Sequence, residues 1–173
     1  MDKHIPSSQQ ASSTFEPVSR SVEETQQLGA RLGACLAAGD VVGLRGDLGS
    51  GKTTFIQGLA HGLGIEPSSV KSRTFVLLRE YPGRVPLIHL DGYRLERPDA
   101  ARELDVDWIF SPTKVTVLEW SERFAGCLPD DYLEITLTHK TTNQRALRAT
   151  AHGPRSATLL QSWQAALKPD ATA

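Results

Sequence analysis

The stretch from residue 41 to residue 54 contains the residue types that bind nucleotide phosphates. An apolar run ends near Arg45, the pattern G-x-x-x-x-G-K-T follows, and a helical segment begins near Lys52, which is the context that a phosphate-binding loop requires. Glycines let such a loop turn tightly, so that its backbone N–H groups point at the phosphates. A helix N-terminus adds a positive dipole. The pattern predicts that the protein binds a nucleoside triphosphate.

Within this loop we expect Lys52 to neutralise the terminal phosphates and the Thr53 hydroxyl to hold Mg²⁺. Gly-rich turns before helices are also common in proteins without a nucleotide, but here the strand before the loop and the helix after it are both visible in the pattern. The predicted nucleotide-binding residues are Gly46, Asp47, Leu48, Gly49, Ser50, Gly51, Lys52, Thr53 and Thr54.

Two carboxylates end apolar segments elsewhere in the chain. Asp91 follows the segment 87–90, and Glu119 follows the segment 115–118. Phosphate-loop enzymes need a carboxylate at the carboxyl end of a strand, across from the loop, and hydrolysis needs both a metal ligand and a group that orients water. An acid after a strand is also a common turn residue or helix cap. Because the loop is present, Asp91 and Glu119 are predicted as catalytic residues and Mg²⁺ ligands.

Three neighbours of these acids have two interpretations each. His89 shares a strand face with Asp91, but two ligands are too few for a metal site, and a hydrogen-bonded core histidine is the better interpretation. Arg94 is either a charge-stabilising arginine or a surface partner of a nearby glutamate. Tryptophan usually packs in a core. Because Trp120 is next to Glu119, we expect it also to shield the site or to present an aromatic anchor to a partner.

The remaining pattern predicts the elements that position these residues. A capping box at Ser21 and Glu24 begins a helix that runs to Gly39. A strand spans 41–45, a helix runs from Lys52 to 62–64, and the later part of 70–81 pairs with 85–90 around a Pro-Gly turn. A short helix, a strand over 114–118, a hairpin of 132–138 with 145–151 and a helix over 155–167 follow. This order predicts an α/β fold of the P-loop NTPase type, three-layered, with helices flanking a mixed parallel and antiparallel sheet.

Length and composition set further limits. The 173 residues suit one domain, expected over 18–168, with disordered tails at 1–17 and 169–173. A net charge of −1, from 19 basic and 20 acidic residues, argues against a protein that binds nucleic acid alone. The two cysteines have no metal or redox spacing. The chain has no apolar run of membrane-span length, so we expect no membrane association and a cytoplasmic location.

Five segments in this order resemble the TsaE (YjeE) family. They are GDLGSGKTT at 46–54, SRTFVLLREY at 72–81, HLDGYRL at 89–95, LEWSER at 118–123 and LPDDYLEI at 128–135. The phosphate loop alone is shared by many NTPases, but its combination with the D-x-Y-R-L segment and the E-W dipeptide is far more specific. The resemblance covers about residues 21 to 152. The family comprises bacterial ATPases of the machinery that forms threonylcarbamoyladenosine (t⁶A) in tRNA.

The resemblance implies roles by position. It implies that the loop and Lys52 wrap the phosphates of ATP, that Thr53 and Glu119 coordinate Mg²⁺, that Asp91 serves near the γ-phosphate and that Trp120 matters for turnover. Thr25 and Arg145 match family positions that approach the nucleotide. The family members hydrolyse ATP slowly alone and act while docked on the TsaB–TsaD heterodimer, which they reset between cycles. The partner complex would then hold the tRNA, which this chain would meet only indirectly.

The chain departs from the family pattern at two positions. In the switch-like segment 72–75, Arg73 stands where the family usually has proline, and Gly92 replaces a commoner apolar residue. Both changes alter the backbone, so they affect the expected position of the switch and of Asp91.

Two other classes of function fit parts of the pattern. A small-molecule kinase would use Asp91 as the base for a substrate hydroxyl, but the chain has no Arg-rich lid segment after the core. A nucleotide-sensing adaptor would control a partner through its binding state rather than through hydrolysis. A GTPase is disfavoured because the sequence lacks the N-K-x-D motif that reads guanine.

Overall fold

A computed structural model of the chain describes residues 13–71 and 77–169. Its sheet has eight strands in the order β1-β8-β7-β3-β6-β5-β4, with β2 also paired to β8. The strands are β1 (Thr14–Phe15), β2 (Val18–Ser19), β3 (Val41–Arg45), β4 (Leu78–Tyr81), β5 (Leu87–Asp91), β6 (Val115–Glu119), β7 (Leu133–His139) and β8 (Arg145–Ala151).

The sheet is mixed, as the pattern predicts. Strand β3 lies parallel to both β6 and β7, and β5 lies parallel to β6. The β4–β5 hairpin and the β7–β8 hairpin each add an antiparallel pair. The four parallel strands therefore place their carboxyl ends at one edge of the sheet, which is where ligands bind in open α/β sheets.

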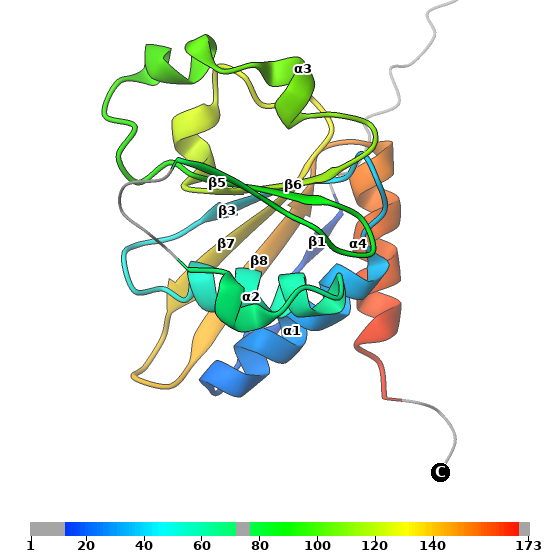
Figure 1. Cartoon of the computed structure of the whole chain (residues 1–173). Helices are drawn as coiled ribbons and strands as arrows, with labels where there is room; N and C mark the ends of the chain where they lie inside the picture. The colour runs from blue at the N-terminus through cyan, green and yellow to red at the C-terminus, as the bar shows by residue number, and fades with distance from the viewer. Residues whose placement is uncertain (1–12, 72–76, 170–173) are drawn as a thin grey trace, which may run out of the picture.

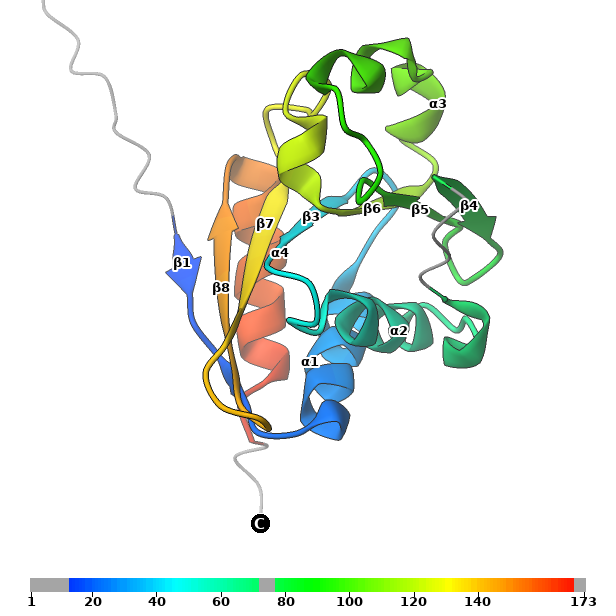
Figure 2. The same cartoon turned by 90° about the vertical axis from the view of Figure 1, so that its left-hand side faces the viewer.

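Helices cover both faces of the sheet, which gives the three layers (Figures 1 and 2). One face carries α1 (Val22–Cys35), α2 (Lys52–Gly62) and α4 (Pro154–Ala166), and the other carries η2 (Pro98–Glu103), α3 (Val106–Ile109) and η3 (Ser121–Phe124). A short turn of helix, η1 (Pro67–Ser69), follows α2. The larger apolar core contains Phe55, Leu160 and Trp163, and the smaller core on the other face contains Ile109 and Phe124.

The first helix begins with a variant of the predicted capping box. The Ser21 hydroxyl accepts a hydrogen bond from the Glu24 N–H at 3.0 Å, and the Glu24 carboxylate accepts one from the Arg20 N–H at 2.7 Å. Glu24 therefore reaches one residue further back than the usual motif, in which it bonds to the cap itself. The helix ends at Cys35, four residues before the predicted Gly39.

The N-terminal boundary also differs from the prediction. Thr14 and Phe15 form a strand beside Thr150 and Ala149, although they lie within the expected tail 1–17. The reason is apolar contact, because the Phe15 ring lies 5.5 Å from the Trp163 ring, centre to centre. Residues 1–12 of the predicted tail lie outside the described residues, as do 170–173 at the other end.

Glycines set the close packing of α1 on α2. Gly29 and Gly33 of α1 face Gly58 and Gly62 of α2, and a Cβ on any of the four would run into the backbone of the opposite helix. The two helix backbones can approach this closely only because these positions have no side chain. Since α2 begins at the predicted nucleotide loop, this packing fixes where that loop lies.

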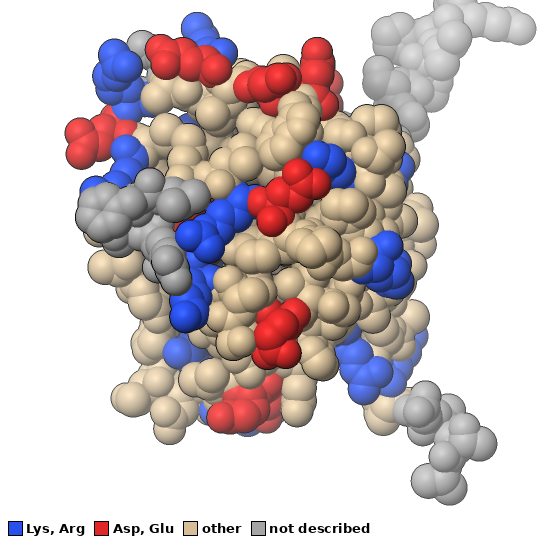
Figure 3. Space-filling model, in the orientation of Figure 1, with Lys and Arg blue, Asp and Glu red and all other residues tan. Residues whose placement is uncertain are grey.

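Charges of both signs are mixed on the surface (Figure 3), as the nearly equal numbers of basic and acidic residues would suggest. On the face seen in Figure 3, Lys and Arg side chains are interspersed with Asp and Glu. None of the helices within the described ranges combines the length and the apolar character that a membrane span requires.

The glycine contact between α1 and α2 makes Gly58→Ala destabilising. In a helix without such a contact, replacing glycine by alanine stabilises by about 0.5–1 kcal/mol. Here the added methyl group meets the Gln26 carbonyl, so we expect a net loss of about 1–3 kcal/mol in the free energy of unfolding. Urea unfolding measures the change, with the exposed Gln161→Ala of α4 as a control. A Gly58→Ala protein as stable as the unchanged one would contradict the packing.

Candidate functional site

The candidate site lies at the carboxyl edge of the parallel strands. Strand β3 leads directly into the predicted phosphate loop, and β6 and β5 end beside it at Glu119 and Asp91. Glu119 stands opposite Leu44 of β3 on one side and opposite Asp91 of β5 on the other. The fold therefore brings the two predicted acids to the edge at which the loop begins.

The loop is built from backbone conformations that favour glycine. Gly49 and Gly51 have φ angles of 78° and 103°, in the left-handed region that side chains disfavour. The Ser50 N–H donates to the Asp47 carbonyl at 3.0 Å, and α2 begins directly after Gly51. The loop thus wraps the N-terminus of α2, where unpaired N–H groups and the helix dipole favour an anion.

Lys52 points back into this loop. Its ammonium group donates to the carbonyls of Gly46 at 2.5 Å and Asp47 at 2.9 Å, and its nitrogen lies 4.0 Å from the centre of the Trp120 ring. The side chain is 5% exposed. Burial lowers the pKa of the Lys52 ammonium below its usual value, while the Glu119 carboxylate acts in the opposite direction. A buried cation held by loop carbonyls and an aromatic ring suits an anionic ligand.

Thr53 and Glu119 face each other next to Lys52. The Thr53 hydroxyl lies 3.3 and 3.4 Å from the two carboxylate oxygens of Glu119. The Glu119 side chain is 3% exposed and also lies 3.0 Å from Nε2 of His89. Hydroxyl and carboxylate oxygens are the ligands that Mg²⁺ prefers. His89 is buried and hydrogen-bonded, as the sequence suggests, but its partner lies on the neighbouring strand.

Trp120 has an unusual backbone. Its φ and ψ are 59° and 48°, and it has the only positive φ among the described residues other than glycine. A conformation of this kind costs about 1–3 kcal/mol and is found preferentially at functional sites. It turns the chain directly after Glu119 and places the indole over Lys52 and 5.4 Å from the Tyr93 ring.

These side chains enclose a pocket of about 450 Å³. It is lined by Leu48, Gly49, Gly51, Lys52, Thr53, Thr54, Tyr93, Glu119, Trp120 and Arg145. The Nε atom of Arg145 is buried without a hydrogen-bond partner among the described residues. A buried donor without a partner is rare, and this one lines the pocket that a phosphate-bearing ligand would fill.

Five predicted residues do not line this pocket: Asp91, Thr25 and, within the loop, Gly46, Asp47 and Ser50. The Asp91 carboxylate lies at the same edge of the sheet and accepts a hydrogen bond from the Tyr93 N–H at 3.0 Å. Thr25 is fully buried, and its hydroxyl bonds to Ser19 Oγ at 2.7 Å and to the Ser21 carbonyl at 3.0 Å. In this structure Thr25 joins α1 to β2, and Asp91 stabilises the turn after β5.

Of the other predicted loop residues, Gly46 and Asp47 contribute through their carbonyls and Ser50 through its hydroxyl, 3.4 Å from the Lys52 ammonium. The predicted switch segment 72–75, with Arg73, lies outside the described residues. Tyr93 lines the pocket and was not predicted as a site residue, although it lies in the D-x-Y-R-L segment on which the family resemblance rests.

Comparisons with known proteins identify the family. The family profile "Threonylcarbamoyl adenosine biosynthesis protein TsaE" matches residues 19–147. Two similar proteins carry the name tRNA threonylcarbamoyladenosine biosynthesis protein TsaE. The one from Bacillus subtilis is 40% identical over 134 residues, 77% of this chain and 83% of its own. The one from a Nostoc species is 44% identical over 133 residues, 74% of this chain and 80% of its own.

A solved structure shares the fold. The crystal structure of Bacillus subtilis YdiB superimposes with a TM-score of 0.75 at 33% sequence identity, and the match covers 90% of this chain and 97% of that one. The α/β fold of the P-loop NTPase type, predicted from the sequence, is confirmed.

The loop glycines make a matched pair for a stability test. Gly49 and Gly51 both have positive φ, but a Cβ on Gly49 would meet open space, whereas one on Gly51 would lie 2.8 Å from Arg145 Nε. Both alanine variants should lose about 1–2 kcal/mol of stability through backbone strain. Urea unfolding should show the larger loss for Gly51→Ala.

The cause of that extra loss can be isolated in the double variant. Adding Arg145→Ala to Gly51→Ala should recover part of the loss. Equal stabilities of Gly49→Ala and Gly51→Ala would show that Arg145 does not pack against the loop as described.

Proposed function

This chain belongs to the TsaE family of threonylcarbamoyl adenosine biosynthesis proteins, and we propose that it is a Mg²⁺-dependent ATPase that acts in t⁶A formation. One observation carries the proposal: the Thr53 hydroxyl and the Glu119 carboxylate meet at 3.3 Å beside the buried Lys52. This pairing joins the phosphate loop to a strand-ending acid, which is the arrangement that phosphate-loop NTPases use for Mg²⁺ and phosphate.

The residues at the site fit Mg²⁺ bound together with a nucleotide. The described residues include no group of three or more His, Cys, Asp or Glu side chains that could hold a metal ion. Mg²⁺ in phosphate-transfer sites takes only one or two protein oxygens and otherwise binds water and phosphate oxygens. Thr53 and Glu119 supply that number. Bound there, Mg²⁺ would neutralise charge on the phosphate oxygens.

In the proposed reaction, water attacks the γ-phosphate of ATP in line with the leaving ADP. Lys52 exchanges its bonds to the Gly46 and Asp47 carbonyls for bonds to phosphate oxygens, and the loop N–H groups stabilise the negative charge. Glu119 and Thr53 would hold Mg²⁺. Asp91, opposite Glu119 in the sheet, would orient the attacking water or water bound to the cation.

Two residues of the pocket wall complete the mechanism. Arg145, with its unpartnered Nε at the pocket, donates to the nucleotide. Trp120 covers Lys52 and keeps solvent water from competing for the ammonium. The first assignment gives the unpartnered Arg145 Nε an acceptor, and the second gives a role to the ring that lies over the buried ammonium.

We further propose that turnover occurs on the TsaB–TsaD complex and resets it between cycles. Family membership supports the pathway, and the near-neutral charge of the chain, −1 overall, supports a role in which the partner complex binds the tRNA. The chain would then contact tRNA only through that complex.

Removing either charged group at the site should abolish most hydrolysis. For Lys52→Ala and Glu119→Ala we expect turnover to fall about 10²–10³-fold, because each removes an electrostatic contact to the transition state worth about 2.7–4 kcal/mol. Phosphate release is measured for the chain alone and with TsaB–TsaD. The exposed Glu103→Ala, at the end of η2 and outside the pocket, is the matched control.

The same assay separates the competing functions. Unchanged turnover in Lys52→Ala and Glu119→Ala would refute the ATPase site. Transfer of the phosphate to a metabolite rather than to water would identify a small-molecule kinase. Nucleotide binding without any turnover, with or without TsaB–TsaD, would identify an adaptor.

A further inference from the structure

His89 forms the shortest side-chain contact of the Glu119 carboxylate among the described residues. Its Nε2 lies 3.0 Å from Glu119 Oε1, whereas the Thr53 hydroxyl lies 3.3–3.4 Å away. Hydroxyl–carboxylate hydrogen bonds are normally 2.5–3.0 Å long, so the contact with Thr53 is loose. The side chains of His89 and Glu119 are 4% and 3% exposed.

This geometry gives the two carboxylate oxygens different surroundings. A buried carboxylate needs hydrogen-bond partners, and the imidazole N–H satisfies Oε1 from strand β5. The Thr53 hydroxyl lies almost equally far from both oxygens, 3.4 Å from Oε1 and 3.3 Å from Oε2, so the two differ by the imidazole alone, and Oε2 is the oxygen without it. Hydrogen bonds of this kind hold metal ligands in a fixed orientation.

We infer that His89 is a positioning residue that holds Glu119 by Oε1, so that Oε2 and the Thr53 hydroxyl are left together for Mg²⁺. This inference rests on the proposed Mg²⁺ and ATP site. Under it, the hydrogen bond of the buried His89 does more than satisfy a polar group in the core, because it also orients the Glu119 carboxylate.

Two substitutions of similar size separate positioning from packing. His89→Gln can place an amide N–H where Nε2 lies, whereas His89→Leu fills the space without a donor. His89→Asn is the fallback if the leucine variant does not fold, because its shorter amide does not reach Oε1.

The test is calorimetric binding of a non-hydrolysable ATP analogue, with saturating Mg²⁺ and with EDTA. We expect His89→Leu to lose about 10–100-fold of the Mg²⁺-dependent gain in affinity, the usual effect of losing such a hydrogen bond. Binding in EDTA should not change, and His89→Gln should stay within a few-fold of the unchanged protein.

Two outcomes would overturn the inference alone: an unchanged Mg²⁺-dependent gain in His89→Leu, or equal losses with Mg²⁺ and with EDTA, which would indicate a packing role. If the unchanged protein bound the analogue no better with Mg²⁺ than with EDTA, the proposed function itself would fail.

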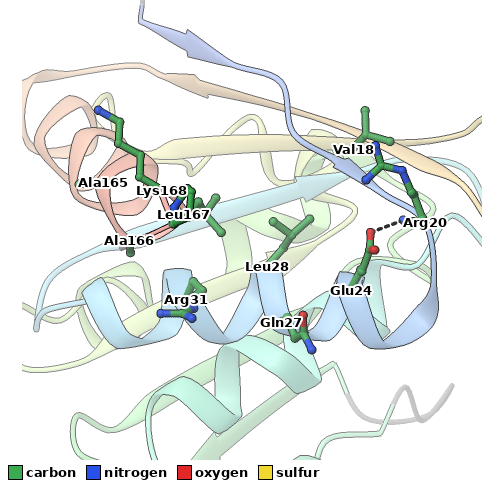
Figure 4. A pocket seen from close by; sticks show the side chains of 11 residues that line it. Val18, Arg20, Glu24, Gln27, Leu28, Arg31, Ala165, Ala166, Leu167 and Lys168 are labelled. Carbon is green, nitrogen blue, oxygen red and sulfur yellow. Dashed lines mark hydrogen bonds between the residues drawn. The ribbon is translucent and has the colours of Figure 1, made fainter. Parts of the chain in front are cut away.

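A second, independent observation is a groove beside β2. It has a volume of about 530 Å³ and lies between the first half of α1 and the end of α4 (Figure 4). Leu28 and Leu167, both half-buried, form its apolar floor. The lining residues are Val18, Arg20, Glu24, Gln27, Leu28, Arg31, Ala165, Ala166, Leu167, Lys168 and Pro169.

The rim of this groove is positively charged. Arg20, Arg31 and Lys168 are exposed and form no ion pair with a described acid, whereas Arg45 and Arg155 each do so elsewhere. The one acid of the lining, Glu24, already accepts the Arg20 N–H at 2.7 Å. Three cations around an apolar floor therefore face solvent in a chain whose net charge is −1.

One strand pair connects the groove with the candidate nucleotide pocket. Val18 and Arg20 of the groove flank Ser19, which pairs in register with Arg145, a residue that lines that pocket.

We propose that the groove binds an acidic segment of a partner protein, with an apolar side chain on the floor and carboxylates at the cationic rim. Phosphates of an RNA backbone would meet the cations but leave Leu28 and Leu167 uncovered. A protein segment with both chemistries matches the floor and the rim together.

The probe is the TsaB–TsaD complex of the proposed function, bound to full-length chain. The double charge reversal Arg31→Glu/Lys168→Glu should weaken binding at least tenfold and reduce the stimulation of ATP hydrolysis, with basal hydrolysis unchanged. Arg97→Glu/Arg102→Glu, on the opposite layer, makes the same charge change and should bind as the unchanged chain does.

Equal binding by both double variants would overturn the groove proposal. So would weaker binding of unmodified tRNA with unchanged binding of TsaB–TsaD, which would identify an RNA site. If the unchanged chain did not bind TsaB–TsaD at all, the partner assignment would fall together with the groove, whereas basal ATP hydrolysis would still stand.

Discussion

The buried carboxylate of Glu119 is the constraint on which the site depends. A carboxylate removed from water is costly unless other groups supply its hydrogen bonds. In this fold the partners come from two other elements, the Thr53 hydroxyl at the start of α2 and the His89 imidazole on β5. Both partners reach Glu119 only if the β5–β6 register and the position of α2 are each correct. The glycine contact with α1 fixes the position of α2.

Much of this arrangement could be predicted from the sequence because it depends on local patterns. The loop motif identifies Lys52 and Thr53, and an acid that ends an apolar run identifies Glu119. The partner of His89 could not be predicted, because local sequence patterns do not give the order of strands in a sheet. His89 and Glu119 lie 30 residues apart in the chain and meet because β5 and β6 are neighbours in the sheet. The short strand at Thr14 was missed because its stability comes from distant Trp163.

Gly92 joins the ends of the two acid-bearing strands. Its N–H donates to the Glu119 carbonyl at 2.9 Å, and a Cβ there would lie 2.7 Å from the Phe124 ring. Glycine at this position therefore lets the turn after β5 lie against the segment after β6. The backbone of the Asp91 turn therefore lies close to Glu119, and the two acid-bearing strand ends are joined by a hydrogen bond as well as by the sheet.

The decisive measurement is a crystal structure with Mg²⁺ and a non-hydrolysable ATP analogue. We predict Mg²⁺ bound to Thr53 Oγ1 and Glu119 Oε2, with His89 still bonded to Oε1 and the Lys52 ammonium moved from the Gly46 and Asp47 carbonyls to phosphate oxygens. A cation held away from Glu119, or a nucleotide bound outside the pocket of Lys52, Trp120 and Arg145, would contradict it.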